Sequence, residues 1–358
     1  MNLDTLRKKL AAVDQQLLTL VKERQDLSHN IGHLKDELGL STRDYGQETR
    51  VLNRARELAG ELGIIPEVAE ELFLVLIRSS LTVQEKQRVT SAGEGSGKQV
   101  LVIGGAGQMG SWMVRFLASQ GYVVDIADPT GPVDGFNSFD DWQDLTLHHD
   151  LIVVAAPLAE SNRILKGLAE RRPRGLVFDI GSLKSPLREG MDALKNAGVK
   201  VASIHPMFGP TTELLSGRHV IFVDVGSEEG TAQAREIFAP TMATLVEMDL
   251  DSHDRLIAYV LGLSHALNII FFTALADSGE EIPKLAQMSS TTFDAQLAVA
   301  SSVARDNPYL YFEIQSLNEF GSESLDALSS ALTQFLTVVK DTDEEGFYSM
   351  MKKGGQYL

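Results

Sequence analysis

The segment KQVLVIGGAGQMGSWMVRFLASQG, residues 98–121, determines how the middle of this chain folds. It begins with aliphatic and β-branched residues, passes through a glycine-rich turn and continues into a helix-like stretch. A buried strand that turns directly into a helix is typical of a parallel α/β sheet. The turn between them is therefore the first place to look for a ligand site.

The glycines of this turn have the spacing that a dinucleotide needs. Gly105 permits a tight turn, Gly107 lets the backbone approach a pyrophosphate, and Gly110 lets the helix pack on the strand. Asp128 ends the next strand, where a carboxylate binds ribose hydroxyls and repels a 2′-phosphate. We therefore predict an NAD site; the alternative is a glycine turn packed only for structural reasons. The predicted cofactor-binding residues are Gly105, Gly107, Gln108, Met109, Gly110 and Asp128.

Four further short apolar runs end in turn residues: YVVDIADP, DLIVVAAP, GLVFDIGS and VKVASIHP. Helix-length segments separate several of them, which predicts a Rossmann-type parallel sheet with crossover helices over residues 98–249. Residues 1–90 have helical periodicity, and SAGEGSG at 91–97 has the composition of a flexible linker. Residues 250–358 are again predicted to be helical. The expected fold class is an all-α domain, an α/β domain and an all-α dimerisation and substrate domain.

The first helical segment carries an apolar seam with one interruption. From Leu3 to Leu38, apolar residues recur at alternating three- and four-residue steps, except at Arg24. This spacing predicts a long amphipathic helix. A guanidinium directed at an apolar seam is costly unless a partner neutralises it. We therefore expect either an acidic partner for Arg24 or an enclosed anionic ligand.

Polar residues on all three N-terminal helices could complete such a ligand site. Lys35 shares a helix face with Arg24, since the residues between them make about three turns. Arg7 points elsewhere and would serve a second site in a symmetry mate. The set suits a small dicarboxylate; the alternative is a coiled-coil dimerisation module with an Arg24–Glu48 ion pair. The candidates are Arg7, Arg24, Lys35, Asp44, Glu48, Ser80 and Gln84.

A second catalytic centre is predicted where VKVASIH ends at His205, just before PMFGP. A histidine at the carboxyl end of a parallel strand faces the crevice in which ligands bind. Its imidazole can accept a proton from a hydroxyl that is being oxidised; the alternative is a histidine that caps a turn. Ser182 and Lys184 follow another strand at the same sheet edge. His148 and His149 precede a strand and are expected to be solvated.

Composition narrows the classes of function. The net charge of −17 argues against nucleic acid and against anionic membranes as partners, so anionic substrates need locally placed cations. The absence of cysteine excludes disulfides and thiolate catalysis, and no metal site is expected. No signal-peptide pattern is present and no uninterrupted apolar run reaches about 18 residues, so a cytoplasmic location is expected. The apolar segment 257–276 is interpreted as a buried helix of a dimer core.

The segment 7–84 resembles the all-helical class of chorismate mutases, which are intertwined dimers. The resemblance implies a pericyclic rearrangement, in which Lys35 and Glu48 contact the ether oxygen of the breaking bond. The family usually has an arginine directly before the Glu48 position, where this chain has Gln47. The resemblance assigns substrate carboxylates to Arg24, Lys35 and, from the other subunit, Arg7, and the other polar positions to Asp44, Ser80 and Gln84.

The motifs GGAGQMG, DIGSLKS, HPMFGP, LGLSHALN and DNPYLY together look like those of prephenate dehydrogenases. A mutase fused before such a domain resembles the bifunctional chorismate mutase/prephenate dehydrogenases of tyrosine biosynthesis. The resemblance implies that His205 deprotonates the ring hydroxyl while hydride moves to NAD and carbon dioxide is lost. It also implies that Ser182 hydrogen-bonds near His205 and the hydroxyl.

The substrate pocket is the second place where the chain departs from its family. The resemblance makes His265 a pocket residue and implies an arginine six residues before the proline of DNPYLY. This chain has Ser302 there, and Arg305 lies nearby in a different direction on the helix. The predicted substrate-binding residues are therefore His265, Ser302 and Arg305.

The two departures, Gln47 and Ser302, leave alternatives for the substrate. One is the same chemistry on amino-substituted analogues, 4-amino-4-deoxychorismate and 4-amino-4-deoxyprephenate, or on arogenate. An alternative of another class is a dehydrogenase whose N-terminal helices only dimerise. The leading hypothesis is a cytoplasmic, homodimeric bifunctional enzyme that acts on small anionic substrates with NAD.

Overall fold

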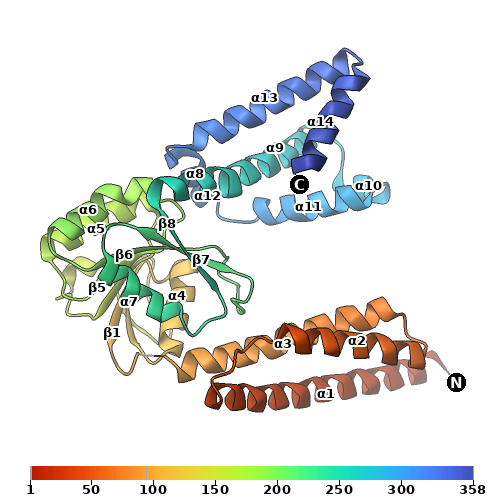
Figure 1. Cartoon of the computed structure of the whole chain (residues 1–358), viewed down its shortest axis with the longest axis horizontal. Coiled ribbons are helices and arrows are strands. Elements are labelled where there is room, and N and C mark those ends of the chain that lie inside the picture. The colour runs from red at the N-terminus through yellow and green to blue at the C-terminus, as the bar shows by residue number, and fades with distance from the viewer. Residues whose placement is uncertain (1, 94, 358) are drawn as a thin grey trace. The chain divides into compact units, whose positions relative to one another are not determined.

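The computed structural model describes residues 2–93 and 95–357, so Met1, Leu358 and Glu94 of the linker lie outside it. Contacts divide the chain into two compact units. Unit 1 comprises Met1–Ala156, Leu168–Ile180 and Leu194–Glu247; unit 2 comprises Pro157–Gly167, Gly181–Ala193 and Met248–Leu358. The sequence of elements is helices, then a sheet, then helices, which confirms the fold class expected from the sequence (Figure 1).

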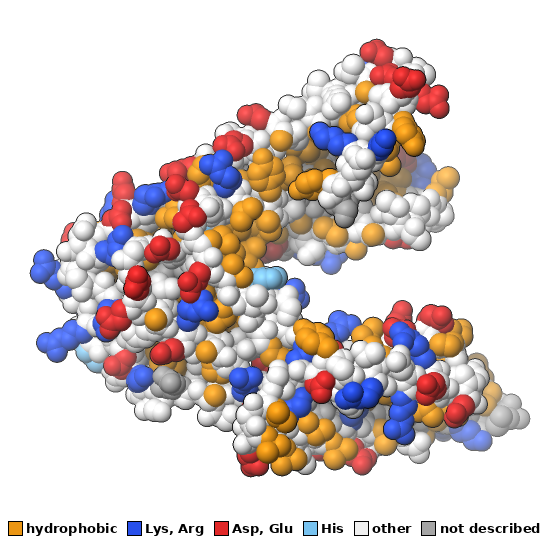
Figure 2. All heavy atoms as spheres, viewed as in Figure 1, with side chains coloured by type: hydrophobic (Ala, Val, Ile, Leu, Met, Phe, Trp, Pro, Cys, Tyr) orange, Lys and Arg blue, Asp and Glu red, His pale blue; other side chains and the backbone are white. Residues whose placement is uncertain are grey.

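The N-terminal helices are α1 (Leu3–Glu37), α2 (Tyr45–Leu62) and α3 (Pro66–Ser91). Only Ser28 and Gly32 of α1 are buried, because these small residues allow α1 to pack closely on α3. The apolar seam faces outward: Leu17, Ile31 and Leu38 are 52%, 48% and 70% exposed. Figure 2 shows apolar side chains exposed on the surface of this helical region. The seam therefore has no partner within the described residues of one chain.

The linker is more ordered than its composition indicated. The N–H groups of Gly95 and Gly97 donate to the carbonyl oxygens of Gln120 and Gly121, at 3.1 Å each. A Cβ at Gly95 would lie 2.4 Å from the nitrogen of Tyr122. Gly95 is therefore needed for close backbone approach, and Gly97 for its φ of +81°, rather than for flexibility.

The sheet has eight strands in the order β3-β2-β1-β4-β5-β6-β7-β8. All registered pairs from β3 to β6 are parallel, as predicted for β1, β2, β4, β5 and β6, whereas β7 is antiparallel to β6. The short strand β3 was not predicted from the sequence. The chain returns from β6 to β7 without a crossover helix, which a parallel pair would need. The strands are β1 (Gln99–Ile103), β2 (Val123–Ala127), β3 (Asn137–Phe139), β4 (Leu151–Val154), β5 (Leu176–Asp179), β6 (Val201–Pro206), β7 (His219–Asp224) and β8 (Thr244–Asp249).

The middle of the sheet is the core of unit 1. Every residue of β4 and β5 is buried, as expected for parallel strands with both faces covered. In unit 1, α4 packs on β1 and β2, and α7 packs on β5, β6 and β7. The helices α4 (Gln108–Ser119) and α7 (Glu228–Phe238) and the short turn η1 (Trp142–Asp144) belong to unit 1. Most of α5 (Leu158–Arg171) and α6 (Arg188–Asn196), and the short turn η2 (Ser185–Leu187), belong to unit 2.

Unit 2 is built around one continuous helical stretch, Leu250–Asp277, of 28 residues. By length and composition this helix could cross a membrane. The sequence did not predict this, because it contains no uninterrupted apolar run of about 18 residues. It nevertheless carries the fully buried pair His253 and Asp254, and its π-helical turn is stabilised where Gln315 Nε2 donates to Gly262 O at 2.8 Å. Its elements are α8 (Leu250–Ile257), η3 (Ala258–Leu263), α9 (Ser264–Asp277), α10 (Ile282–Gln287), α11 (Thr291–Ala304), α12 (Pro308–Leu317), α13 (Gly321–Lys340) and α14 (Glu344–Tyr357).

Candidate active sites

The glycine turn after β1 has the geometry of a pyrophosphate cradle. Gly104 has a φ of +84°, in the region that favours glycine. A Cβ at Gly110 would lie 2.0 Å from Gly104 O, so α4 could not approach the strand this closely with any other residue. Gly107 and Gln108 are exposed, and α4 begins there without a side-chain cap. The first-turn N–H groups of α4 therefore suit phosphate oxygens, and the site fits a dinucleotide.

Asp128 lies at the end of β2 beside this turn and is only 6% exposed. One carboxylate oxygen accepts a hydrogen bond from Ala106 N at 3.0 Å, and the other accepts from Thr130 N at 2.9 Å. The carboxylate is thus fixed against the glycine turn. This position supports the prediction that Asp128 binds the ribose hydroxyls. The hydrogen bond from Ala106 N also gives Asp128 a role in fixing the conformation of the turn.

Arg24 is directed into the helical domain, onto α3. Its Nη1 donates to Leu76 O at 2.6 Å and to Ser80 Oγ, and Ser28 Oγ donates to Ser80 Oγ at 2.9 Å. Burial lowers the pKa of Arg24, and no described carboxylate pairs with it. A half-buried guanidinium held only by neutral oxygens keeps its charge available for an anion.

The Arg24–Glu48 ion pair, considered as an alternative, is wrong. Both carboxylate oxygens of Glu48 instead accept from Arg43, from Nε at 2.9 Å and from Nη2 at 3.1 Å. Arg43 was not among the predicted site residues. Position 47 does not face inward: Gln47 is exposed and its Oε1 accepts from Arg50 Nε at 3.0 Å.

Of the other predicted residues of this site, two are at least partly buried and two are exposed. Lys35 Nζ donates to Thr42 O at 2.6 Å, and Gln84 is buried with its Oε1 lacking a partner in the described structure. An unsatisfied buried acceptor is costly and indicates a missing donor. Asp44 is exposed and caps α2 through Gln47 N, while Arg7 is exposed near the start of α1.

His205 is 4% exposed and lies near the carboxyl end of β6 in unit 1. On the neighbouring strand end, Asp179 accepts a hydrogen bond from Ser203 Oγ at 2.6 Å. His205 therefore has the position expected of a general base at this sheet edge. His149, predicted to be solvated, is 2% exposed, because its Nε2 hydrogen-bonds Asp125 Oδ2 at 3.1 Å beneath the loop.

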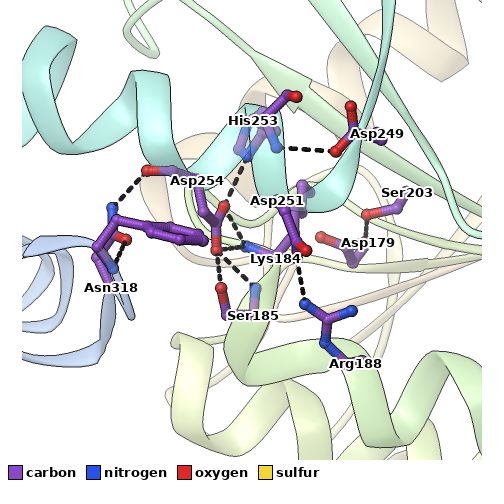
Figure 3. Close-up of polar contacts among 12 residues, drawn as sticks. Asp179, Lys184, Ser185, Arg188, Ser203, Asp249, Asp251, His253, Asp254 and Asn318 are labelled. Atoms are coloured by element: carbon purple, nitrogen blue, oxygen red, sulfur yellow. Dashed lines mark hydrogen bonds and ion pairs between the residues drawn. The ribbon is translucent and has the colours of Figure 1, made fainter.

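In unit 2, a buried carboxylate organises the loop that contains Ser182 (Figure 3). Asp254 accepts from Lys184 N at 3.0 Å, from Ser185 N at 2.7 Å and from His253 Nδ1 at 2.7 Å. Burial alone raises the pKa of Asp254, but the hydrogen bonds of His253 and Ser185 outweigh it and hold the pKa below the ordinary value of an aspartate. Asp254 was missed from the sequence, although an acidic residue in an apolar helix was a visible signal.

His265 stacks on Tyr311 of the DNPYLY motif, with ring centroids 4.0 Å apart. Burial lowers the pKa of His265, and its Nδ1 is buried without a partner in the described structure. Tyr311 donates to Asp306 Oδ2 at 3.1 Å, and burial together with Asp306 raises the pKa of Tyr311 to about 12. Ser302 and Arg305 are both exposed at the end of α11.

Comparison with known proteins matches all three regions to families. Residues 6–85 match chorismate mutase type II, residues 134–247 match the prephenate dehydrogenase nucleotide-binding domain, and residues 249–353 match the prephenate dehydrogenase dimerization domain. The chain joins a chorismate mutase to a prephenate dehydrogenase. It is therefore an isomerase and an oxidoreductase, as the sequence predicted. The nucleotide-binding match begins after the glycine turn, so that turn is assigned on its own geometry.

Similar proteins match the chain over all or most of its length. The T-protein of Enterobacter agglomerans is 24% identical over 99% of this chain and 93% of its own length. The 4-amino-4-deoxyprephenate dehydrogenase of Streptomyces pristinaespiralis is 28% identical over 70% of this chain and 88% of its own. The structure of A. aeolicus prephenate dehydrogenase with hydroxyphenyl propionate and NAD+ has a TM-score of 0.55 at 18% identity, covering 73% of this chain and 97% of that one. That likeness establishes the dehydrogenase fold.

Gly110→Ala should damage both the fold and the cofactor site of the dehydrogenase. The added Cβ collides with backbone, so we expect a loss of stability of roughly 2 kcal/mol or more, and a loss of NAD affinity. Thermal unfolding and titration with NAD measure the two effects. The control is Gly60→Ala in α2, where no atom lies within 4 Å of the new Cβ. A Gly110→Ala variant that melts and binds like the wild type would contradict the cradle.

Asp254→Asn should loosen the Ser182 loop. The asparagine amide would present a donor to two N–H donors, costing about 3 kcal/mol at neutral pH. Because the pKa is lower in the folded state, the contribution of Asp254 is fully present above the ordinary pKa of an aspartate and is lost as pH falls through the lowered pKa of the folded state.

Amide exchange at Lys184 and Ser185, followed against pH, measures this effect. The matched control is Asp251→Asn, on the same helix as Asp254. This change removes an exposed ion pair between Asp251 and Arg188 of α6 and should cost under about 1 kcal/mol. Equal exchange rates in both variants would refute the role of Asp254.

Proposed function

We propose that this chain converts chorismate to prephenate in its helical domain and then oxidatively decarboxylates prephenate to 4-hydroxyphenylpyruvate with NAD. The main observation in support of the mutase site is Arg24. This cation is half-buried in a chain of net charge −17, and no described carboxylate neutralises it. The domains we propose are 1–90 for the mutase, 91–97 for the linker, 98–249 for the NAD-binding domain and 250–358 for the dimerisation and substrate domain.

In the mutase site, the side chains select a compact conformer and stabilise charge. Arg24 and Lys35 hold the substrate carboxylates together with Arg7 of a second copy. Lys35 donates to the ether oxygen, on which negative charge develops as its bond to carbon breaks, and Glu48 contacts the substrate beside that bond. Ser80 orients Arg24, and Gln84 supplies a buried acceptor for a substrate hydroxyl. Asp44 completes the polar rim.

In the dehydrogenase site, His205 accepts the proton of the ring hydroxyl, and Ser182 orients that hydroxyl. NAD, when bound, supplies the hydride acceptor. The C–H bond electrons leave as hydride, the carboxylate on the same ring leaves as carbon dioxide, and the ring becomes aromatic. Asp128 favours NAD over NADP because its carboxylate repels a 2′-phosphate. Gln108 and Met109 at the start of α4 complete the cofactor site.

The substrate pocket of the dehydrogenase includes His265, whose pKa burial lowers. Arg305 supplies a cation near the position where Ser302 replaces the arginine of the family. This replacement favours a second candidate substrate, 4-amino-4-deoxyprephenate, on which the Streptomyces relative acts according to its name. Arogenate is a further amino-bearing alternative.

A homodimer in the cytoplasm is the assembly we propose. The exposed seam of α1 needs an apolar partner, and a second copy presents an identical one. In unit 2, Leu256, Val260 and Ile270 of the long helix are each about half exposed, at 53%, 53% and 49%. These residues suit a dimer core rather than lipid, since the same helix buries Asp254. Sedimentation equilibrium measures the assembly directly, and a monomer at micromolar concentration would contradict it.

Two single substitutions should separate the activities. His205→Asn should remove dehydrogenase turnover and spare the mutase, whereas Arg24→Ala should lower mutase turnover by about 100-fold or more and spare the dehydrogenase. Loss of chorismate and formation of NADH from prephenate are followed on the same preparations. Arg24→Ala with full mutase activity would favour the alternative of a helical module that only dimerises.

The wild-type enzyme should prefer prephenate over its amino analogue if Arg305 replaces the missing arginine. Comparing kcat/KM for NADH formation from prephenate, arogenate and 4-amino-4-deoxyprephenate decides this. Arg305→Ala should raise KM for prephenate about tenfold, through loss of one charged contact. A higher kcat/KM for the amino analogue would instead establish the second candidate.

A further inference from the structure

Three side chains of the helical domain bind one loop of the nucleotide-binding domain, all within unit 1. This β6–β7 loop, residues 207–218, follows directly after the strand that carries His205. Glu85 accepts from Leu215 N at 2.7 Å, Arg43 Nη1 donates to Ser216 Oγ at 2.6 Å, and Lys86 pairs with Glu213 at 3.1 Å. The loop is thus attached to the same helices that carry the mutase residues.

Arg43 differs from the other two contacts because it also holds a mutase residue. Its Nε and Nη2 bind the two carboxylate oxygens of Glu48 in a forked geometry, which leaves Nη1 for Ser216. The side chains of Arg43 and Glu48 are only 29% and 19% exposed, and the guanidinium lies 4.4 Å from the centroid of the Tyr45 ring. Glu48 raises the pKa of Arg43 through its hydrogen bonds. Each of the three guanidinium nitrogens of Arg43 therefore donates a hydrogen bond.

The loop is a rigid anchor for Arg43 rather than a mobile one. Leu215 is 3% exposed and belongs to the hydrophobic core of the sheet. The carboxylate of Glu85 bridges Leu215 N and, at 2.5 Å, Met242 N, and it is 3% exposed. Thr212 O accepts from Trp112 Nε1 at 2.9 Å, which ties the loop to α4. Ser216 thus follows directly after a stretch of the loop that is held in place at Thr212, Glu213 and Leu215.

We propose that Arg43 is a positioning residue for the mutase reaction and that Ser216, from the nucleotide-binding domain, completes its placement. A carboxylate that contacts the substrate beside the breaking bond must be held at one orientation, and Arg43 sets the orientation of Glu48. The inference rests on the proposed function, since it requires that Glu48 contacts the substrate. If Arg43 acts in this way, a residue of the nucleotide-binding domain helps to position the side chains of the mutase site.

A double-mutant cycle in the full-length enzyme tests the proposal. Ser216→Ala should lower mutase kcat/KM about three- to tenfold, the size of one ordinary protein hydrogen bond, with the change mainly in kcat. Arg43→Ala should lower it further. In the Arg43→Ala background, Ser216→Ala should have no additional effect, because the two residues act through one contact. Ser216→Thr keeps the hydroxyl and should retain the activity.

The matched control is Lys86→Ala, which removes the exposed contact to the same loop and should change mutase kcat/KM less than twofold. Dehydrogenase turnover of prephenate, measured on the same preparations, should stay within twofold in Ser216→Ala. Wild-type mutase activity in Ser216→Ala, an equal effect of Ser216→Ala in both backgrounds, or a parallel fall of both activities would overturn the proposal. A wild-type enzyme that does not convert chorismate would instead overturn the proposed function itself.

Discussion

The approach of α4 to β1 at Gly110 is the constraint on which the dehydrogenase domain depends. Since a Cβ there would lie 2.0 Å from Gly104 O, only glycine lets the helix begin directly above the strand end. That position aims the first turn of α4 at the sheet edge and brings Ala106 N within 3.0 Å of Asp128. One missing methyl group thus determines the turn, the carboxylate beside it and the space for a pyrophosphate.

The helical domain must bind anions although the chain has a net charge of −17. It does so by half-burying cations against neutral oxygens. Arg24 binds Leu76 O and Ser80 Oγ, and Lys35 binds Thr42 O at 2.6 Å. Long-range attraction from the whole protein cannot help here, so local desolvated charges must provide the affinity. The small residues Ser28 and Gly32 make room for this arrangement by bringing α1 close to α3.

Buried carboxylates connect segments that are far apart in sequence. Glu85 on α3 binds the backbone of Leu215 and Met242, and Asp254 on α8 binds the backbone of Lys184 and Ser185. In both cases the carboxylate receives several N–H donors, which offset the cost of burial. Burial raises the pKa of Glu85 even so, while the stronger set around Asp254 lowers its pKa. Loops that precede or follow candidate catalytic residues are thereby held in place.

The sequence by itself determined the three N-terminal helices, the parallel strands β1, β2, β4, β5 and β6, the glycine turn and the enzyme class, because each leaves a local pattern. Apolar periodicity shows a helix face, and strand, turn and helix signals at fixed offsets show a nucleotide fold. Tertiary structure alone decided the partner of Glu48, the burial of His149 and the anchoring of the Ser182 loop by Asp254. Arg43 and Ser216 are 173 positions apart, and no local pattern links them. The physical reason is that a charged side chain is stabilised by whichever donors folding brings within about 3 Å of it, and only the packed chain specifies which donors those are.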